Sequence, residues 1–232
     1  MNEPEGLKRL AAARALEEVR SGMKLGLGTG STVAHFLELL GGALRDGTLR
    51  DVVGIPSSVR TERRAAALGI PLSRLGDHRR LDLTVDGADE VSPELDLIKG
   101  MGGALLREKM LVQASEHFLV IADDRKSVAK LGTLSPLPVE VVDWGWEAHA
   151  AWLADRGARV DVLRTEGGEP FLSDNGNLML VCRFPEGIED AEGLHAGLKA
   201  RAGVVETGLF LGMADRAILS GRDGIRVEMR RT

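Results

Sequence analysis

The first 130 residues alternate short apolar runs with segments of helical spacing. Apolar runs at 23–27, 51–57 and 81–86 read as strands, whereas 31–44 and 58–68 space their apolar residues as a helix does. Strands that alternate with helices predict a parallel, doubly wound α/β sheet. Ligands bind such sheets beyond the carboxyl ends of the strands, so the turns that follow these runs are the expected functional positions.

The pattern changes after residue 130. A strand-helix-strand-strand-helix order follows, in which the turn "SDNGN" separates two extended runs. This order resembles a split β-α-β unit, typical of a small ferredoxin-like α+β domain. We therefore expect a Rossmann-like domain at 1–130 and 204–232, whose last short strands rejoin the first sheet, and a smaller domain at 131–203.

Composition excludes several classes of protein. The 232 residues carry a net charge of −5, so no basic field attracts nucleic acid. No apolar run approaches the roughly 18 residues of a membrane span, and the N-terminus lacks a signal-peptide core. The scattered histidines and the single cysteine lack zinc-ligand spacing. Cys182 lies in an apolar run, where a small buried side chain is expected, and a lone cysteine suits the reducing cytoplasm.

The first chemistry-bearing stretch is "GLGTGST", Gly26–Thr32, between a strand and a helix. Its backbone N–H groups and hydroxyls could hold a phosphate at the start of the helix, which we expect to begin with a hydroxyl cap. A tight turn without a ligand explains the same residues equally well. Ser31 stands where a dinucleotide fingerprint needs glycine, and no P-loop lysine follows, so neither nucleotide motif is present.

The second stretch, "DGADE", places Asp86, Asp89 and Glu90 at the end of an apolar strand. Carboxylates this close repel one another, which can bring a carboxyl group into the range of proton transfer. A solvated acidic turn that caps a helix, or a magnesium site, would use the same residues.

The third stretch is "KGMGGALLREK", where Lys99 precedes a glycine cluster and Glu108 follows on a predicted helix. Gly100 and Gly102 could bring backbone amides to an oxyanion, Lys99 could neutralise that charge, and Glu108 could act as a general base. Alternatively, Glu108 is an exposed helix residue in a surface ion pair. The glycines favour the functional interpretation, because glycine in an ordered segment destabilises it unless a close approach requires it.

Three other residues carry weaker signals. Lys126 follows the strand at 117–124 and Lys8 lies on the first helix, and each could be an ordinary solvated lysine. His35 lies on the helix after the first glycine turn, where a structural role is expected because no partner acid is evident.

Together the three turns bring phosphate-binding groups, carboxylates and a lysine to one edge of a sheet, without a redox or metal motif. This combination suits proton transfer on a small phosphorylated molecule. Aldose–ketose isomerisation requires such groups, since a base moves a proton between neighbouring carbons while donors and a cation stabilise the enediolate.

The sequence closely resembles the type A ribose-5-phosphate isomerases. The match spans residues 26–218 in the order of that family. It is carried by "GLGTGST", "DGADE", "KGMGGALLREK", "IADDRK" with the following "LPVEVV", and "VVETGLFLGMADRAI".

This resemblance implies interconversion of D-ribose 5-phosphate and D-ribulose 5-phosphate in the pentose phosphate pathway, without a metal or cofactor. It implies that Glu108 is the base, that Asp86 and Asp89 assist ring opening and hydroxyl proton transfer, and that Lys99 lines the reacting end. The substrate-binding positions that it implies are Thr29, Gly30, Ser31, Thr32, Asp86, Gly87, Ala88, Asp89, Lys99, Gly100, Met101, Gly102 and Lys126, with Lys8 as a further phosphate contact. It also implies a Rossmann-like domain with a smaller ferredoxin-like domain, and a homodimer or tetramer in the cytoplasm.

One residue departs from the family pattern, which has glycine where Met101 stands. Methionine can supply the same backbone N–H if its φ stays negative, whereas a positive φ would strain it by about 1 kcal/mol or more.

Other functions remain possible from the residues alone. A hexosamine 6-phosphate isomerase/deaminase could use a related fold. A sugar-phosphate sensor would keep the phosphate groups without needing Glu108, although no DNA-binding extension is evident.

Overall fold

The structure is a computed structural model that describes residues 3–230 and consists of two compact units. Unit 1 comprises the described parts of Met1–Ala88, Arg107–Lys126 and Met213–Thr232. Unit 2 comprises Asp89–Leu106 and Ser127–Gly212.

Unit 1 is built on a six-stranded sheet of order β13-β12-β6-β3-β1-β2. All neighbouring strands are parallel except β13, which is antiparallel to β12, so the doubly wound α/β sheet expected from the sequence is confirmed. Since β1 lies between β2 and β3, the chain reverses its direction of winding there, which is where such sheets bind ligands. The strands are β1 (Lys24–Leu27), β2 (Val53–Pro56), β3 (Leu81–Asp86), β6 (Ser115–Asp123), β12 (Arg216–Gly221) and β13 (Gly224–Met229).

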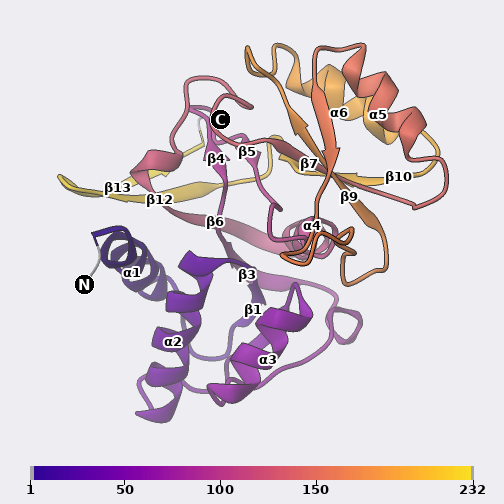
Figure 1. Ribbon diagram of the computed structural model, residues 1–232. Helices are drawn as coiled ribbons and strands as arrows, with labels where there is room; N and C mark the ends of the chain where they lie inside the picture. The colour runs from indigo at the N-terminus through magenta and orange to yellow at the C-terminus, as the bar shows by residue number, and fades with distance from the viewer. Residues whose placement is uncertain (1–2, 231–232) are drawn as a thin grey trace. The chain divides into compact units, whose positions relative to one another are not determined.

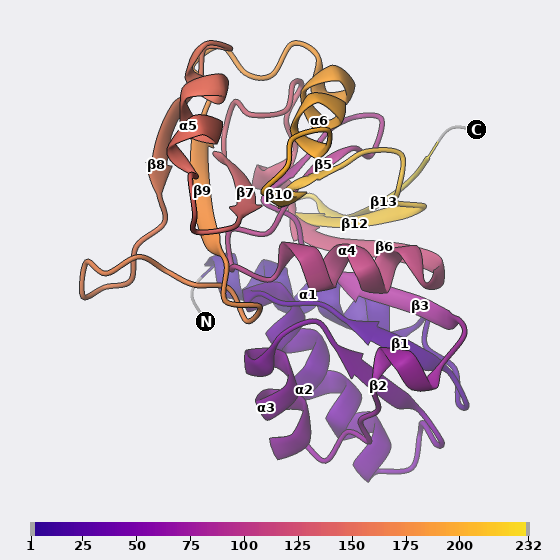
Figure 2. The same ribbon diagram turned by 90° about the vertical axis from the view of Figure 1, so that its right-hand side faces the viewer.

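Helices cover both faces of this sheet (Figure 2). The first face packs against α1 (Glu3–Leu16), α2 (Ser31–Arg45) and α3 (Val59–Ala67), around a core that includes Phe36, Leu40 and Val85. The other face carries α4 (Leu105–Gln113). Two short 3₁₀ helices, η1 (Leu75–Asp77) and η2 (Asp124–Lys126), complete the unit.

Unit 2 contains a four-stranded antiparallel sheet of order β10-β7-β9-β8. Its elements run β7 (Leu137–Val141), α5 (Glu147–Ala154), β8 (Arg159–Val162), β9 (Leu178–Arg183), α6 (Ala191–Lys199) and β10 (Val204–Thr207), as Figure 1 shows. This is the β-α-β-β-α-β order of a ferredoxin-like fold. Both helices lie together, since Gly197 of α6 packs against the Trp152 ring of α5.

A second, three-stranded antiparallel sheet in unit 2 joins β4 (Glu90–Val91), β5 (Leu97–Ile98) and β11 (Leu209–Phe210). The expectation that all strands after residue 204 rejoin the first sheet is therefore wrong for β10 and β11, and correct for β12 and β13. Unit 2 thus takes in chain outside 131–203. The division into one domain at 1–130 and 204–232 and a second at 131–203 stays a prediction.

The expected hydroxyl cap of α2 is also wrong. Gly30 is the N-cap, with φ 146° and ψ 174°, and Ser31 is the first helical residue. Helix α3 does start with such a cap, because Ser58 accepts a hydrogen bond from the Thr61 backbone N–H.

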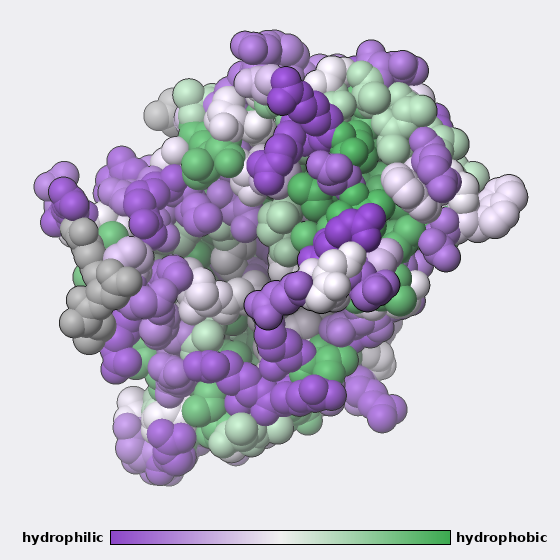
Figure 3. All heavy atoms as spheres, in the orientation of Figure 1, coloured by the Kyte–Doolittle hydropathy of each residue, from purple (hydrophilic) through white to green (hydrophobic). Residues whose placement is uncertain are grey.

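Hydrophilic side chains cover much of the face seen in Figure 3, with apolar side chains between them. Within residues 3–230, no helix has both the length and the apolar content needed to cross a membrane.

Candidate active site

The carboxyl ends of β1, β2 and β3 meet at one level of the unit 1 sheet. Leu27 at the end of β1 is in register with Pro56 of β2 and Val85 of β3. The residues just after these strands therefore lie side by side, because parallel strands end at the same edge.

Asp86, the last residue of β3, is fully buried at this edge. Its Oδ1 accepts hydrogen bonds from the backbone N–H groups of Thr29, at 3.1 Å, and Gly87, at 2.7 Å. A Cβ on Gly28 would lie 2.1 Å from the Asp86 carboxyl carbon. Glycine is therefore required at residue 28 so that the turn can approach the carboxylate, and the two amides stabilise a negative charge on it.

Four hydroxyl groups form a buried cluster beneath the first glycine turn. Thr29 Oγ1 lies 2.8 Å from Ser57 Oγ, 2.7 Å from Ser58 Oγ and 2.9 Å from Thr61 Oγ1. The Thr61 hydroxyl also donates to the Gly28 carbonyl at 2.8 Å. Ser57, Ser58 and Thr61 were not identified from the sequence, although two serines at and just after the end of a predicted strand were a usable signal.

The first turn of α2 borders a cavity of about 280 Å³. Its lining includes Gly30, Ser31, Arg60, Thr61 and Arg64. A helix N-terminus together with two guanidinium groups makes this hollow favourable for an anion.

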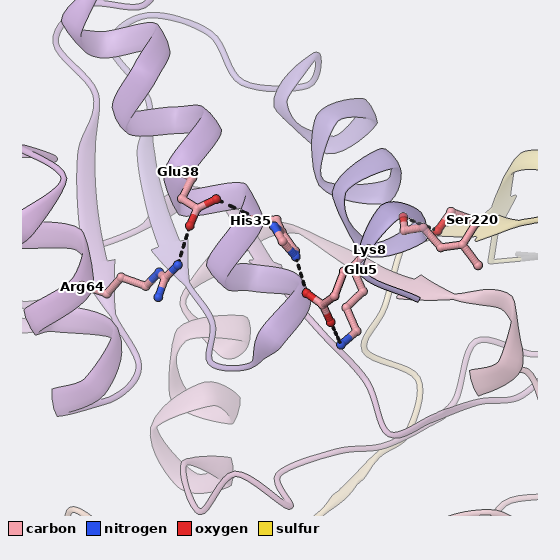
Figure 4. Close-up of polar contacts among 7 residues, drawn as sticks. Glu5, Lys8, His35, Glu38, Arg64 and Ser220 are labelled. Carbon is pink, nitrogen blue, oxygen red and sulfur yellow. Dashed lines mark hydrogen bonds and ion pairs between the residues drawn. The ribbon is translucent and has the colours of Figure 1, made fainter. Parts of the chain in front are cut away.

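A chain of ion pairs connects α1 with α2 and α3 (Figure 4). The Lys8 ammonium contacts Glu5 at 2.6 Å, and the other oxygen of Glu5 lies 2.8 Å from His35 Nε2. The Lys8 hydrogen bond, and then the His35 hydrogen bond, lower the pKa of Glu5. His35 therefore has a partner acid that was not evident from the sequence, and the contact with Glu5 joins two helices, as a structural histidine would. Because His35 lies one turn after Ser31, these contacts hold Lys8 near the first turn of α2.

The same chain continues from α2 to α3. Glu38 lies 3.8 Å from His35 Nδ1, and its carboxylate pairs with Arg64 at 2.6 Å. Arg64, one of the two arginines that line the cavity, is thus held by α2.

Glu108 is 2% exposed, so the alternative of an exposed surface glutamate is wrong. Thr84 of β3 contacts Ser115 at 2.7 Å, and the Ser115 hydroxyl donates to the Leu111 carbonyl of α4. The even-numbered side chains of β3, including Asp86, therefore point to the face that α4 covers. Since α4 leads into the amino end of β6, its first turn with Glu108 lies toward the carboxyl edge, where Asp86 ends β3.

Lys126 ends η2, directly after β6, and is half-buried at the same edge of the sheet. The preceding Asp123 is buried at 2% exposure and accepts a hydrogen bond from Arg125 at 2.6 Å. Burial opposes the charged form of Asp123, yet the Arg125 hydrogen bond and charge outweigh it, so its pKa is lowered.

Thr32 and Ala88 belong to unit 1, whereas Asp89, Lys99, Gly100, Met101 and Gly102 belong to unit 2. Lys99 follows β5, is 2% exposed, and holds its ammonium 4.8 Å from the centroid of the Phe210 ring. The backbone N–H of Met101 donates to Asp89 Oδ2 at 3.1 Å. Met101 keeps φ outside the left-handed region, so methionine supplies the amide there without backbone strain.

The glycine cluster of unit 2 needs its glycines at two positions. Gly100 and Gly103 have φ values of 103° and 79°. A Cβ on Gly103 would lie 2.3 Å from the Phe171 ring, and one on Gly100 would lie 2.4 Å from Leu105 Cβ. Gly102, in contrast, does not have positive φ. Phe171 and Phe210 were not identified from the sequence.

Glu90 has a structural role that differs from the expected acidic cluster. It is fully buried, and its two oxygens accept hydrogen bonds from the backbone N–H groups of Gly132, Leu134 and Ser135. The carboxylate of Glu90 therefore anchors the loop after residue 130. In the described part of the chain, no three His, Cys, Asp or Glu residues are grouped to hold a metal ion.

Comparisons with known proteins agree on one family. The model of ribose 5-phosphate isomerase A (phosphoriboisomerase A) matches residues 53–224. The ribose-5-phosphate isomerase A of Nitrobacter hamburgensis is 51% identical over 98% of this chain and 99% of its own. That of Chloroflexus aurantiacus is 48% identical over 96% of this chain and 92% of its own.

Solved structures give the same result. The ribose 5-phosphate isomerase from Plasmodium falciparum superposes with a TM-score of 0.95 at 37% identity, covering 98% of this chain and 100% of the other. A D-ribose-5-phosphate isomerase in complex with phospho-erythronic acid also gives 0.95 at 37% identity, covering 99% of this chain and 100% of the other. The chain belongs to the ribose 5-phosphate isomerase A family.

Proposed function

We infer that this chain is an aldose–ketose isomerase that interconverts D-ribose 5-phosphate and D-ribulose 5-phosphate. The observation that carries this conclusion is its relationship to ribose-5-phosphate isomerases A over nearly its whole length, 98% of the chain in one case. A phosphorylated sugar as substrate also suits the solved relative that holds phospho-erythronic acid.

We propose that Glu108 is the base. It takes the proton from C2 of the open-chain aldose, and the electron pair of that C–H bond moves to form the enediolate. The same carboxyl then returns the proton to C1, while the O2 hydroxyl proton passes to O1, so that C2–O2 becomes the ketose carbonyl and O1 becomes a hydroxyl. The burial of Glu108 supports this role, since a base that water cannot reach keeps the proton for return.

The proposal gives Asp86 and Asp89 the proton transfers at oxygen. Ring opening requires removal of the O1 proton and delivery of a proton to the ring oxygen, and a carboxylate close to both can do this. The two backbone amides on Asp86 Oδ1 fix that carboxylate, and the Met101 amide fixes Asp89. Lys99, held beside Phe210, would neutralise the enediolate.

The phosphate end is assigned to the turn Thr29–Thr32, with Lys126 and Lys8. The N-terminus of α2 supports this, because its N–H groups and partial positive charge favour a phosphate. The backbone of Gly87, Ala88, Gly100 and Gly102 would complete the substrate contacts.

The test is ketose formation from ribose 5-phosphate by the purified protein, with a chelator present. Glu108→Gln should remove most of kcat and leave KM nearly unchanged, because it alters a transition-state role. Unimpaired turnover in that variant would exclude Glu108 as the base. A wild-type protein that releases ammonia from a hexosamine 6-phosphate, or that binds ribose 5-phosphate without turnover, would contradict the isomerase assignment.

We further propose that the protein works in the cytoplasm as a homodimer, without metal or cofactor, and with neither nucleic acid nor membrane as partner. Light scattering of the purified protein measures the oligomeric state directly, and a monomeric mass would contradict the homodimer.

A further inference from the structure

We propose that Ser57 and Thr61 are positioning residues for the isomerisation, and that they act through Thr29 on the Asp86 carboxylate. This role rests on the proposed function of Asp86. All four residues belong to unit 1, and each is at least nine-tenths buried.

The directions of the hydrogen bonds show how the serine hydroxyls hold the Thr29 side chain. The Thr29 hydroxyl donates to Ser58 Oγ at 2.7 Å. Its oxygen is therefore the acceptor for Ser57, whose Oγ lies 2.8 Å away. Ser57 thus binds the Thr29 hydroxyl from one side while Ser58 binds it from the other, and the Thr29 side chain is left with one rotamer.

Thr61 fixes the backbone of the same turn. Its hydroxyl donates to the Gly28 carbonyl at 2.8 Å and also lies 2.9 Å from Thr29 Oγ1. The peptide unit between Gly28 and Thr29 is therefore held at its carbonyl by Thr61, while its N–H donates to Asp86 Oδ1 at 3.1 Å. Since a peptide unit is planar, fixing the carbonyl also sets the direction of the N–H.

The peptide between Gly28 and Thr29 lies so close to Asp86 that it has little room to rotate. Gly28 lies so near the carboxylate that a Cβ there would be 2.1 Å from Asp86 Oδ1. A rotation of the peptide would therefore move the N–H away from Oδ1 and release the carboxylate from the position that proton transfer needs. Misplacements of this size reduce rates strongly, because reacting groups must be held within a fraction of an ångström.

Ser58 belongs to the cluster but cannot test the idea by itself. It is also the N-cap of α3, since it accepts the Thr61 N–H at 3.0 Å. Its loss would weaken the helix as well as the turn. Ser57 has no such second role in the contacts described here, and it does not line the cavity at α2.

The first experiment compares Ser57→Ala with Ser115→Ala in the ribose 5-phosphate assay. Ser115 is the matched control, because it also contacts a threonine hydroxyl of the same sheet, Thr84 at 2.7 Å, but at the amino end of β6. We expect Ser57→Ala to lower kcat about tenfold with KM within about twofold of wild type, while Ser115→Ala leaves both nearly unchanged. Both variants should shift the thermal midpoint similarly.

A double variant separates positioning from a general loss of structure. In the Asp86→Asn background, Ser57→Ala should change kcat by less than about twofold, because its effect passes through the Asp86 carboxylate. A full tenfold effect in that background would overturn the proposal.

A second pair guards against poor folding of Ser57→Ala. Thr61→Val keeps the shape and removes the hydroxyl, whereas Thr61→Ser keeps the hydroxyl. We expect kcat to fall in Thr61→Val and to be retained in Thr61→Ser. Equal kcat in the two variants, with an active wild type, would overturn the positioning role alone. A wild type without isomerase activity would overturn the proposed function, and the positioning role with it.

Discussion

At the scale of single residues, the carboxyl edge of the unit 1 sheet depends on glycines that allow neighbouring strands and side chains to approach closely. Gly26 of β1 and Gly28 of the turn after it lie directly beside Thr84 and Asp86 of β3, and an added Cβ would meet those side chains at 1.9 Å and 2.1 Å. These glycines are needed for close approach, and neither has positive φ.

Gly28→Ala should therefore lower both activity and stability. The new methyl group must displace the Asp86 carboxylate, so we expect a loss of kcat of at least tenfold and a loss of about 1–3 kcal/mol in the free energy of unfolding. Gly42→Ala is the matched control, because nothing lies within 4 Å of its Cβ position inside α2. It should retain activity and gain about 0.5–1 kcal/mol. Chemical denaturation and the isomerase assay measure both, and a Gly28→Ala enzyme with wild-type kcat would contradict this account.

His149 of α5 gives a pH dependence at the same scale. Its burial, and secondarily the nearby Arg201 charge, lower its pKa below the ordinary value of 6.5. The unfolded chain then takes up a proton near pH 6.5, whereas the folded protein does so only at lower pH. The contribution of His149 to stability is thus complete above about pH 6.5 and falls as the pH drops toward its folded pKa.

His149→Gln should make the free energy of unfolding less sensitive to pH between 6.5 and 5. Denaturant titrations at pH 7.0, 6.0 and 5.0 for both proteins measure this. Identical slopes in the wild type and the variant would show that His149 does not titrate as inferred.

At the scale of elements, one irregular segment of unit 2 supports the glycine cluster. The segment 163–177 joins β8 to β9, and Glu140 of β7 anchors it. Glu140 Oε1 accepts hydrogen bonds from Ser173 at 2.7 Å, Asn175 at 3.1 Å and Asn177 at 2.9 Å. This anchoring places the Phe171 ring against Gly103.

Phe171→Ala should release Gly103 and increase the mobility of the Lys99–Gly103 stretch. We expect kcat to fall several-fold with a small change in thermal midpoint, because Phe171 is only half-buried. Leu172→Ala is the control, because Leu172 is next to Phe171 in the chain and its side chain is 54% exposed. This variant should behave as wild type. Equal kcat values for the two variants would contradict a supporting role for Phe171.

At the scale of the whole molecule, neither unit is a continuous stretch of chain. The chain passes between them after residues 88, 106, 126 and 212. All three tryptophans and Cys182 lie in unit 2, whereas α1 to α4 lie largely in unit 1. Burial raises the pKa of the Cys182 thiol to about 12, so it should resist modification while folded.

We expect the two units to unfold together, because each unit is assembled from separate stretches of chain and the chain crosses between the units four times. Tryptophan fluorescence, labelling of Cys182 by a thiol reagent, and helical circular dichroism should then share one denaturant midpoint. Labelling of Cys182 that precedes the loss of helical signal would show that unit 2 unfolds on its own.

The sequence by itself determined the parallel sheet with its helices, the ferredoxin-like order of unit 2 and the family. It could do so because strand–helix alternation and motifs are patterns of residues close together in the chain. It also singled out Asp86, Lys99 and Glu108. Only the tertiary structure decided that Thr29 meets Ser57 and Thr61, that Phe171 covers Gly103, and that Glu90 turns away to hold the loop at 132–135. The physical reason is that these contacts depend on which strands are neighbours in the sheets. β1 lies between β2 and β3, and β10 pairs with β7. Neither arrangement can be predicted from residues close together in the chain.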